Sequence, residues 1–454
     1  MPSSSLRNTI FALSSAPGRA GVAVFRLSGP ESMPALKQIA SKTCPPRVLT
    51  HTVLTDPQSG ETIDEAMAVS MPAPASFTGE DVVELHVHGS RAVTAALANV
   101  LSAMPGLREA EPGEFTRRAF ENGKMDLTAA EGLADLINAD TEAQRRQAFR
   151  QLQGEFGKLT ETWRERLVRA LAHLEASIDF IEEDLPATLD EAVRRELTDI
   201  QASIEGHLAD RHCGERLRDG LHIAIIGPPN AGKSSLLNVL ARRDAAIVSS
   251  VAGTTRDVIE VQLDLEGYPV VLADTAGLRD SDDPIESEGV RRASARARDA
   301  DLCLAVLDQS GWPDVDPQTA SLIDEDTLVV INKIDLGDPA PPLEIKGLPA
   351  LGISVETGAG IESLLTQLTA EVAERCHLSA APAITRARHR QALEDCRNAI
   401  LRALEPTAEQ PDHQDPELIA EDLRLAVRAL GRITGRVDVE DILDVIFKDF
   451  CIGK

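Results

Sequence analysis

The chain has 454 residues, of which 43% are hydrophobic and 26% charged, a composition typical of a soluble protein with two or three domains. Its formal net charge of −27 argues against a protein that binds nucleic acid over its whole surface, so any RNA should meet a local patch or a partner protein. No apolar run approaches the roughly 20 residues that span a bilayer, residues 1–12 lack a secretory signal, and the six cysteines form no C-x-x-C pair. We therefore expect a cytoplasmic protein with reduced thiols and no membrane contact.

Three textures follow one another along the chain. Residues 1–120 mix short β-type runs, such as 22–27 and 82–87, with turn signals, which indicates an α+β domain. Residues 125–217 are rich in Ala, Leu, Glu and Arg, and the apolar spacing within 161–181 predicts an amphipathic helix. Apolar strands then alternate with helical segments from 222 to 354, the pattern of a parallel α/β sheet. Helical texture returns from residue 385.

Two helical blocks around one α/β block favour a multidomain protein in which the α/β domain is inserted into a helical domain. We predict an N-terminal domain over 1–120, a first helical part over 121–217, the α/β domain over 218–380 and a second helical part over 381–454. Four consecutive domains are the plainer alternative.

Residues 227–234, G-P-P-N-A-G-K-S, match the phosphate-binding pattern G-x-x-x-x-G-K-[ST]. A predicted strand at 221–226 precedes the motif and a predicted helix at 234–242 follows it, so backbone N–H groups and a helix N-terminus can cradle phosphates. Lys233 is expected to pair with the β- and γ-phosphates and Ser234 to ligate Mg²⁺. A glycine-rich turn without function is the alternative. The predicted contacts in this loop are Asn230, Ala231, Gly232, Lys233, Ser234 and Ser235.

Three later elements indicate that the nucleotide is GTP or GDP. Residues 270–277 form a strand that ends in D-x-x-G, and residues 332–335 read N-K-x-D after another strand. A carboxylate in the second motif accepts both N1–H and N2–H₂ of guanine, which adenine does not offer. Residues 354–356 stand where a loop supports the base, with valine in place of the usual alanine. The predicted contacts are Asp274, Thr275, Ala276, Gly277, Asn332, Lys333, Asp335, Ser354, Val355 and Glu356.

Thr254 and Thr255 lie between the phosphate loop and Asp274, where a switch threonine would complete the Mg²⁺ site. By itself the segment reads as a polar turn, and the preceding phosphate loop is what favours a switch. Leu278 follows D-x-x-G at the position where Ras-type proteins carry the glutamine that orients the attacking water. Hydrolysis must therefore take its water-orienting group and its positive charge from elsewhere.

Over almost its whole length the chain resembles the tRNA modification GTPase family known as MnmE or TrmE. The resemblance rests on P-G-R-A-G-V at 17–22, S-F-T-G-E-D at 76–81, E-P-G-E-F-T-R-R-A-F at 111–120, K-M-D-L-T at 124–128, A-G-T-T-R-D at 252–257 and F-C-I-G-K at 450–454. It implies a folate-binding, dimerising N-terminal domain, a helical domain, and a Ras-like P-loop G domain inserted into the helical domain.

The resemblance also implies a function and partners. The family forms a homodimer that joins the FAD-containing protein MnmG (GidA) in a heterotetramer. The complex acts on tRNA, placing a (carboxymethyl)aminomethyl-type group on C5 of the wobble uridine at position 34. The one-carbon unit comes from 5-formyl- or methylene-tetrahydrofolate.

For hydrolysis, the family uses K⁺ as the positive charge and a switch II glutamate for the water, which matches Glu286 here. Asn230 reads alone as a turn residue, and residues 282–288 as a solvated acidic loop. The resemblance implies nucleotide or metal contacts at Ser249, Ser250, Val251, Ala252, Gly253, Thr254 and Thr255. The implied metal set is Asn230, Ser234, Ser249, Val251, Thr254 and Thr255.

For folate, the matching positions are Arg26, Glu84, Lys124 and Lys454, and Cys451 is a candidate catalytic thiol in a mobile tail. Read singly, the first three are a surface arginine, a strand glutamate and a lysine at a helix start. His86 and His88 point to one face of a strand, but without a third ligand they read as ordinary strand histidines rather than a metal site.

Two further hypotheses remain at this point. A ribosome-assembly GTPase of the Era or Der type shares the central motifs but lacks this N-terminal domain and C-terminal tail. A signalling switch with slow turnover and a protein activator is the other.

Overall fold

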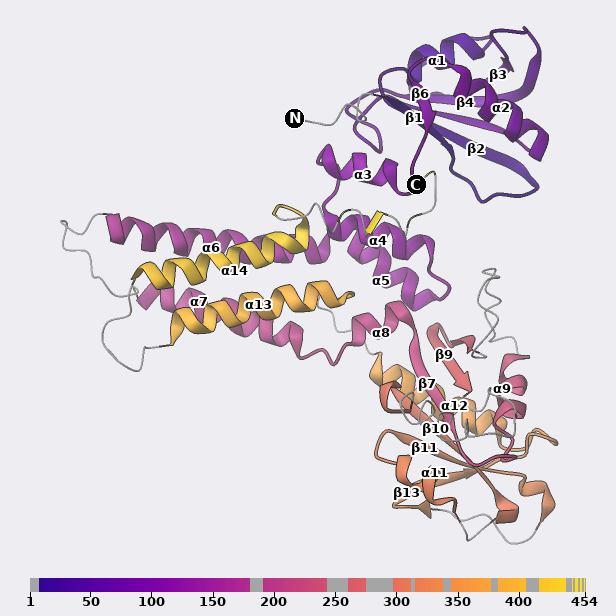
Figure 1. The fold of residues 1–454 in the computed structure, drawn as a ribbon, viewed down its shortest axis with the longest axis vertical. Helices are drawn as coiled ribbons and strands as arrows, with labels where there is room; N and C mark the ends of the chain where they lie inside the picture. Colours follow the sequence, from indigo (N-terminus) through magenta and orange to yellow (C-terminus); the bar gives the residue numbers. More distant parts are fainter. Residues whose placement is uncertain are drawn as a thin grey trace, which may run out of the picture. The chain divides into compact units, whose positions relative to one another are not determined.

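The structure is a computed structural model that describes residues 8–179, 191–242, 260–274, 297–311, 315–337, 344–376, 383–405 and 416–437, and beyond these residues 443, 446, 447, 450 and 453. The chain forms two compact units (Figure 1). The N-terminal unit comprises Met1–Ala134 and Gly431–Lys454, and the central unit comprises Asp135–Leu430. None of the helices in the described part of the chain combines the length and apolar character that a membrane crossing requires.

The N-terminal unit is built on a six-stranded sheet, which confirms the α+β prediction. Neighbouring strands are antiparallel except β1 and β6, which run parallel. The strand order is β3 (Thr50–Thr55), β4 (Thr62–Met71), β5 (Val82–Gly89), β2 (Ala20–Ser28), β1 (Thr9–Leu13) and β6 (Leu107–Glu109).

The two faces of this sheet differ in their cover. Helices α1 (Ser32–Ile39) and α2 (Arg91–Ala103) pack on one face, where Val83, Leu85 and Val87 of β5 are buried. The alternate residues of β5, Glu84, His86 and His88, belong to the other face and are only partly buried or exposed. Because strand residues alternate between faces, this pattern leaves a polar row on the face opposite α1 and α2.

Helix α3 (Glu114–Glu121) holds a buried ionic network that the sequence analysis did not predict. Arg118 is 1% exposed and donates hydrogen bonds to Glu114 (2.9 Å), Glu80 (3.1 Å) and the Asn8 carbonyl (3.0 Å). Burial raises the pKa of Glu114, but hydrogen bonds from Arg108, the Glu111 N–H and Arg118 outweigh this effect and leave the pKa below its usual value. The carboxylate therefore stays ionised inside the unit.

The end of the chain returns to the N-terminal unit. Leu443, Phe447 and Phe450 pack against Leu127 and Ala130 of α4 (Leu127–Ile137). Gly453 is buried, and its carbonyl accepts a hydrogen bond from the Ser14 hydroxyl at 2.9 Å. Gly453 thus touches the loop that follows β1.

In the central unit, helices from both sides of the α/β segment pack together (Figure 1). On α6, Trp163 donates a hydrogen bond to Ser203 of α7, and Glu175 pairs with Arg424 of α14 at 2.9 Å. Residues 161–179 of the predicted amphipathic helix belong to α6, which begins six residues earlier, and residues 180 and 181 lie outside the described part of the chain. The α/β segment is therefore an insertion, as predicted. The helices are α5 (Glu142–Leu152), α6 (Glu155–Asp179), α7 (Glu191–Leu208), α8 (Cys213–Asp219), α13 (Ala387–Leu404) and α14 (Pro416–Thr434).

The inserted segment is a seven-stranded sheet with helices on both faces. Helices α9 (Lys233–Ala241) and α12 (Ile361–Arg375) cover one face, and α11 (Pro317–Leu322) packs on the other. The strand order is β12 (Glu344–Ile345), β13 (Leu348–Gly352), β11 (Thr327–Asn332), β10 (Leu302–Asp308), β7 (Leu221–Ile226), β9 (Tyr268–Asp274) and β8 (Glu260–Leu265).

The five inner strands are parallel, as predicted, but the edge strands β8 and β12 are antiparallel. Both edges are tight hairpins with two residues at positive φ, Glu266 and Gly267 in one and Lys346 and Gly347 in the other. Positive φ at both central residues matches the twist of a two-residue hairpin, which explains the local reversal.

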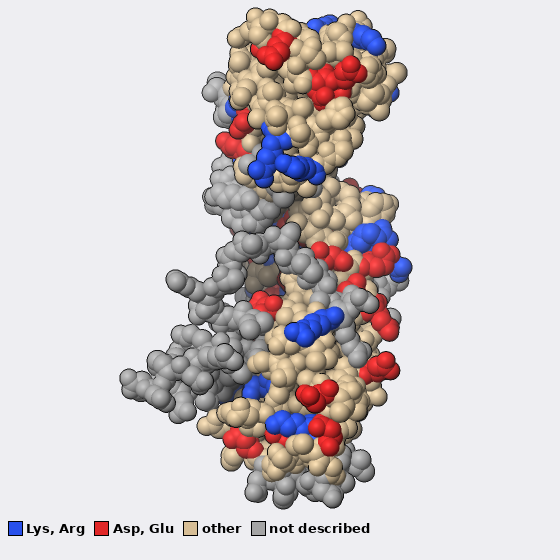
Figure 2. All heavy atoms as spheres, turned by 90° about the vertical axis from the view of Figure 1, so that its right-hand side faces the viewer, with Lys and Arg blue, Asp and Glu red and all other residues tan. Residues whose placement is uncertain are grey.

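On the described part of the face shown in Figure 2, acidic and basic side chains are interspersed.

Candidate functional site

The phosphate-loop motif joins the central strand β7 to helix α9. Gly227 has φ +147°, and a Cβ there would lie 2.1 Å from the Val306 carbonyl oxygen of β10. Gly232 has φ +97°, and its Cβ would lie 2.3 Å from Nδ2 of Asn332. Both conformations favour glycine. The loop therefore lies close against the neighbouring strand ends, and the first N–H groups of α9 face an anion site.

The side chain of Lys233 folds back over this loop. Its side chain is 7% exposed, and Nζ donates hydrogen bonds to the carbonyls of Gly227 and Pro228, both at 2.8 Å. Ser234, Ser235 and Asn230 are exposed around it, whereas Ala231 is buried. The predicted contacts within the phosphate loop thus lie together at the start of α9.

Asn332 connects the phosphate loop to the predicted base loop. It is 3% exposed, its Nδ2 donates to the Ala231 carbonyl at 2.9 Å, and its Oδ1 accepts from the Val355 N–H at 3.1 Å. One amide therefore spans two loops that are more than 100 residues apart in the sequence. The sequence analysis assigned Asn332 to the base motif and did not foresee this bridging role.

Hydrogen bonds of Ser354 hold the base loop. Ser354 is buried and donates to the carboxylate of Asp335, while its own hydroxyl accepts from the Thr357 N–H at 3.1 Å. Asp335 itself is exposed, as is Glu356. The hydroxyl of Ser354 thus orients a carboxylate that remains open to a ligand.

Lys333 reaches back to a residue that the sequence analysis missed. Its Nζ lies 2.6 Å from Oδ2 of Asp308, the last residue of β10. Burial raises the pKa of Asp308, but hydrogen bonds from Lys333 and Ser310 outweigh it and lower the pKa below its usual value. The sequence did contain a signal for Asp308: an acidic residue ends an apolar strand, and parallel strands of a sheet end at the same edge, where Lys333 also lies.

Asp274 is the last residue of β9 and lies opposite Ile225 of β7 in the parallel ladder, so its backbone is beside the start of the phosphate loop. The remaining predicted residues lie outside the described part of the chain. They are Ser249, Ser250, Val251, Ala252, Gly253, Thr254, Thr255, Thr275, Ala276, Gly277, Glu286, Cys451 and Lys454.

A second candidate site lies in the N-terminal unit, where Arg26 and Glu84 face each other across β2 and β5. Arg26 donates to Oε1 of Glu84 from Nε at 3.0 Å and from Nη2 at 2.9 Å. Its guanidinium carbon also lies 5.3 Å from the ring centre of Phe77 and 5.9 Å from that of Phe115. A carboxylate and aromatic rings together suit a flat heterocycle that carries an amino group.

Lys124 adjoins the loop that carries Phe77. Its Nζ donates to the Pro74 carbonyl at 3.0 Å, and its side chain borders Gly79. The two strand histidines do not converge on a metal: His88 pairs with Asp64 at 2.8 Å, whereas His86 lies beside Glu84. Among the described residues, no cluster of three metal-ligating side chains is present.

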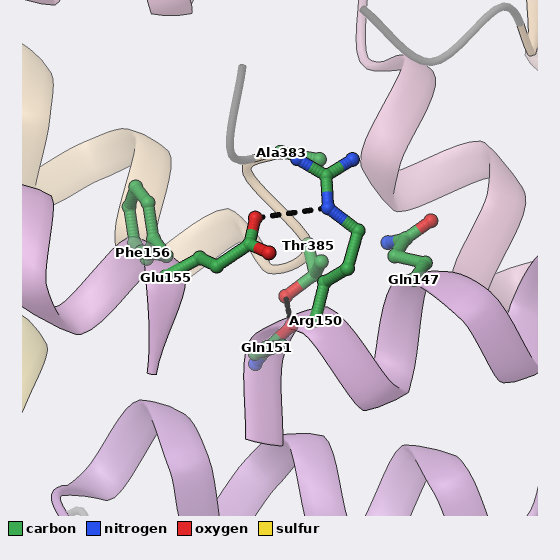
Figure 3. Close-up of a pocket in the computed structure, with 7 residues that line it drawn as sticks. All are labelled: Gln147, Arg150, Gln151, Glu155, Phe156, Ala383 and Thr385. Carbon is green, nitrogen blue, oxygen red and sulfur yellow. Dashed lines mark hydrogen bonds and ion pairs between the residues drawn. The ribbon is translucent and has the colours of Figure 1, made fainter. Parts of the chain in front are cut away.

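A third group of polar side chains surrounds a small cavity between α5, α6 and the segment before α13 (Figure 3). Arg150 pairs with Glu155 at 2.9 Å, and Thr385 donates to Gln151 at 2.8 Å. The space is about 20 Å³, enough for a single water. It is too small for a nucleotide or a folate, so it does not compete with the other two sites.

The fold and the first site define a class: a P-loop GTP-binding protein in which a doubly covered sheet carries the phosphate loop, Asp274 and N-K-x-D at the carboxyl ends of its strands. Comparison with known proteins narrows this. Residues 9–124 match the family model described as the GTP-binding protein TrmE N-terminus, and residues 127–451 match the MnmE helical domain.

Relatives agree along the whole chain. It is 56% identical to the tRNA modification GTPase MnmE of Paramagnetospirillum magneticum, over 99% of this chain and 100% of the relative. It is 48% identical to a human mitochondrial 5-taurinomethyluridine tRNA synthase subunit, GTPB3, over 98% of this chain and 93% of that one. The chain belongs to the MnmE family of tRNA modification GTPases.

Among solved structures, the G domain of the Thermotoga maritima FeoB iron transporter is 25% identical and covers 34% of this chain and 98% of its own length. Its TM-score is 0.26, which is too low to support an argument.

Proposed function

We propose that this chain hydrolyses GTP to GDP and phosphate as part of tRNA modification. The observation that carries the proposal is the Asn332 bridge, which ties the phosphate loop to the loop beside Asp335. A nucleotide that places its phosphates on α9 and its base at Asp335 would meet both ends of one connected site.

The residues divide the work by chemistry. Backbone N–H groups of the phosphate loop and the ammonium of Lys233 bind the phosphates. The Asp335 carboxylate accepts from N1–H and N2–H₂ of guanine. Mg²⁺ would be held by Ser234 and the switch threonine Thr255 near Asp274, and it would neutralise phosphate charge. The exposed hydroxyl of Ser234 at the start of α9 fits that ion.

The base assignment is tested by Asp335→Asn. An asparagine presents an N–H₂ donor where guanine also donates, so affinity for GTP should fall by about 10- to 100-fold, the effect of one charge-assisted hydrogen bond. Xanthosine triphosphate, which carries an acceptor at C2, should gain affinity. Glu362→Gln, an exposed acid at the start of α12, is the matched control. Unchanged preference for guanine in fluorescence titrations would refute the assignment.

We propose that K⁺ activates hydrolysis within a homodimer. Leu278 occupies the position at which Ras-type proteins carry the water-orienting glutamine, so this chain lacks that group there. Asn230 is exposed on the phosphate loop. Asn230, Ser249, Val251 and Thr254 would offer K⁺ an oxygen cage, and Glu286 would orient the water. The ion supplies positive charge to the developing phosphate.

This proposal predicts faster turnover in KCl than in NaCl of equal ionic strength, without any partner protein. Asn230→Ala should lose most of the difference while still binding GDP, because its backbone N–H remains in the loop. Equal rates for the unaltered chain in the two salts would contradict K⁺ activation.

We propose further that the homodimer works in the cytoplasm with the FAD-containing protein MnmG. Together they would modify C5 of the wobble uridine of certain tRNAs with a tetrahydrofolate one-carbon unit. The Arg26–Glu84 pair beside two aromatic rings supports a pterin at this site, with Lys124 and Lys454 for the anionic tail and Cys451 as an assisting thiol. Mass spectrometry of tRNA nucleosides from a deletion strain tests the proposal. If the wobble uridine is still modified to the same extent in the deletion strain, a ribosome-assembly GTPase is favoured instead.

A further inference from the structure

The two oxygens of the Glu84 carboxylate have different surroundings. Oε1 accepts both hydrogen bonds from Arg26, at 3.0 and 2.9 Å. Oε2 lies 3.6 Å from Nε2 of His86, just beyond hydrogen-bond distance. Arg26 therefore holds the carboxylate by one oxygen, and the second oxygen keeps lone pairs for another donor.

His86 is placed to meet that second oxygen. It stands two residues after Glu84 on β5, so both side chains belong to the same face of the sheet. Its Nε2 is buried and has no hydrogen-bond partner among the described residues. A buried polar nitrogen without a partner costs free energy, and Oε2 of Glu84, 3.6 Å away, is an acceptor that can relieve this cost.

We propose that His86 is a positioning residue of the folate pocket and acts through Glu84. In the tautomer with its proton on Nε2, His86 donates to Oε2 once the carboxylate turns toward a bound pterin. With Arg26 on one oxygen and His86 on the other, the plane of the carboxylate is fixed. Its remaining lone pairs then face the 2-amino group and N3–H of the ligand. The inference rests on the folate site proposed above.

His88 supplies the contrast. It lies two residues further along the same strand face, but its ring and backbone N–H are both bound to Asp64, at 2.8 and 2.7 Å. His88 is exposed and is engaged away from Glu84. A substitution of His88 removes a similar ring from the same strand without changing the surroundings of the Glu84 carboxylate.

The experiment measures binding of two probes to the full chain by isothermal titration: folic acid and its 2-desamino-2-methyl analogue. His86→Leu should weaken folic acid by about tenfold, the effect of one lost hydrogen bond to a charged group, and should weaken the analogue less, because the analogue keeps N3–H but lacks the 2-amino group. His86→Gln, which keeps an N–H donor, should restore most of the affinity. His88→Leu should bind both probes like the unaltered chain.

The outcomes separate this inference from the proposal beneath it. If His86→Leu weakens both probes equally, or if His86→Gln rescues nothing, His86 shapes the pocket only and the inference is wrong. Glu84→Gln tests the site itself. If that variant binds folic acid as well as the unaltered chain, the folate site is misassigned whatever residue 86 does.

Discussion

Asn332 is the first residue of the N-K-x-D motif, and its side chain forms hydrogen bonds with the phosphate loop and the base loop. Its amide nitrogen bonds to the phosphate loop and its amide oxygen to the base loop, with the side chain buried between them. A polar group buried in this way is costly to remove, since both partners lose their hydrogen bonds. The residue therefore sets the spacing of the two ends of the site.

We predict that Asn332→Ala weakens GDP binding by at least about tenfold, because the Ala231 carbonyl and the Val355 N–H each lose a partner worth roughly 1 kcal/mol or more. Titration with a fluorescent GDP analogue measures the change. Leu336→Ala is the control, since Leu336 is 60% exposed a few residues away. Equal affinity in the two variants would show that the bridge does not organise the site.

Arg118 illustrates the same principle away from the nucleotide. Its guanidinium is balanced by Glu114 and Glu80, so that no charge in the cluster is left without an opposite one. Removing one member of such a buried set is destabilising because the others remain buried and uncompensated. The network joins α3 to the loop that carries Phe77, and so supports the ring that contacts Arg26.

At the scale of elements, the end of β7 and the middle of β10 approach so closely that only a glycine fits between them. The Gly227 Cβ position lies 2.1 Å from a backbone oxygen of Val306, which cannot turn aside as a side chain would. A side chain at position 227 would therefore meet the backbone of β10 directly after the pairing of β7 with β10 ends.

We predict that Gly227→Ala destabilises the inserted domain by at least about 2 kcal/mol, from strain at positive φ and from overlap with the strand. Gly311→Ala is the matched control, because a Cβ there meets nothing within 4 Å. Thermal unfolding followed by scanning calorimetry compares the two. A melting temperature lowered equally in both variants would contradict the explanation.

At the scale of the whole molecule, Gly453 contacts Leu13 and Ser14, and the last of these precedes it by 439 residues in the sequence. Gly453 has φ +98°, and a Cβ there would lie 2.3 Å from the Leu13 carbonyl oxygen. Ser14 adds a hydrogen bond to the Gly453 carbonyl. Gly453 is therefore held by backbone contacts that only glycine permits at this position.

We predict that Gly453→Ala breaks the contacts of this residue with Leu13 and Ser14, so that carboxypeptidase removes C-terminal residues about tenfold faster from the folded protein, because cleavage follows the population of the open form. Gly21→Ala, on the same unit with nothing near its Cβ, should leave the rate unchanged. Identical rates for the two variants would mean that the contacts of Gly453 do not limit cleavage.

The sequence by itself determined the order of domains, the insertion of the G domain and the guanine-nucleotide motifs. These features rest on local chemistry: glycines, a lysine and carboxylates at set distances along the chain, and apolar periodicity that separates helices from strands. The bounds of β7 agree with the sequence prediction, whereas the antiparallel edge strands depend on turn conformations that the pattern did not reveal.

Only the tertiary structure decided which residues meet across the chain. The Asn332 bridge, the Lys333–Asp308 pair, the Arg118 network and the position of His86 beside Glu84 all join separate elements or depend on side-chain placement. Spacing along the sequence places Glu84 and His86 on one face of a strand, but it does not tell which residues of separate elements meet. They follow from strand order and register, which bring the ends of parallel strands to one edge and alternate side chains to one face.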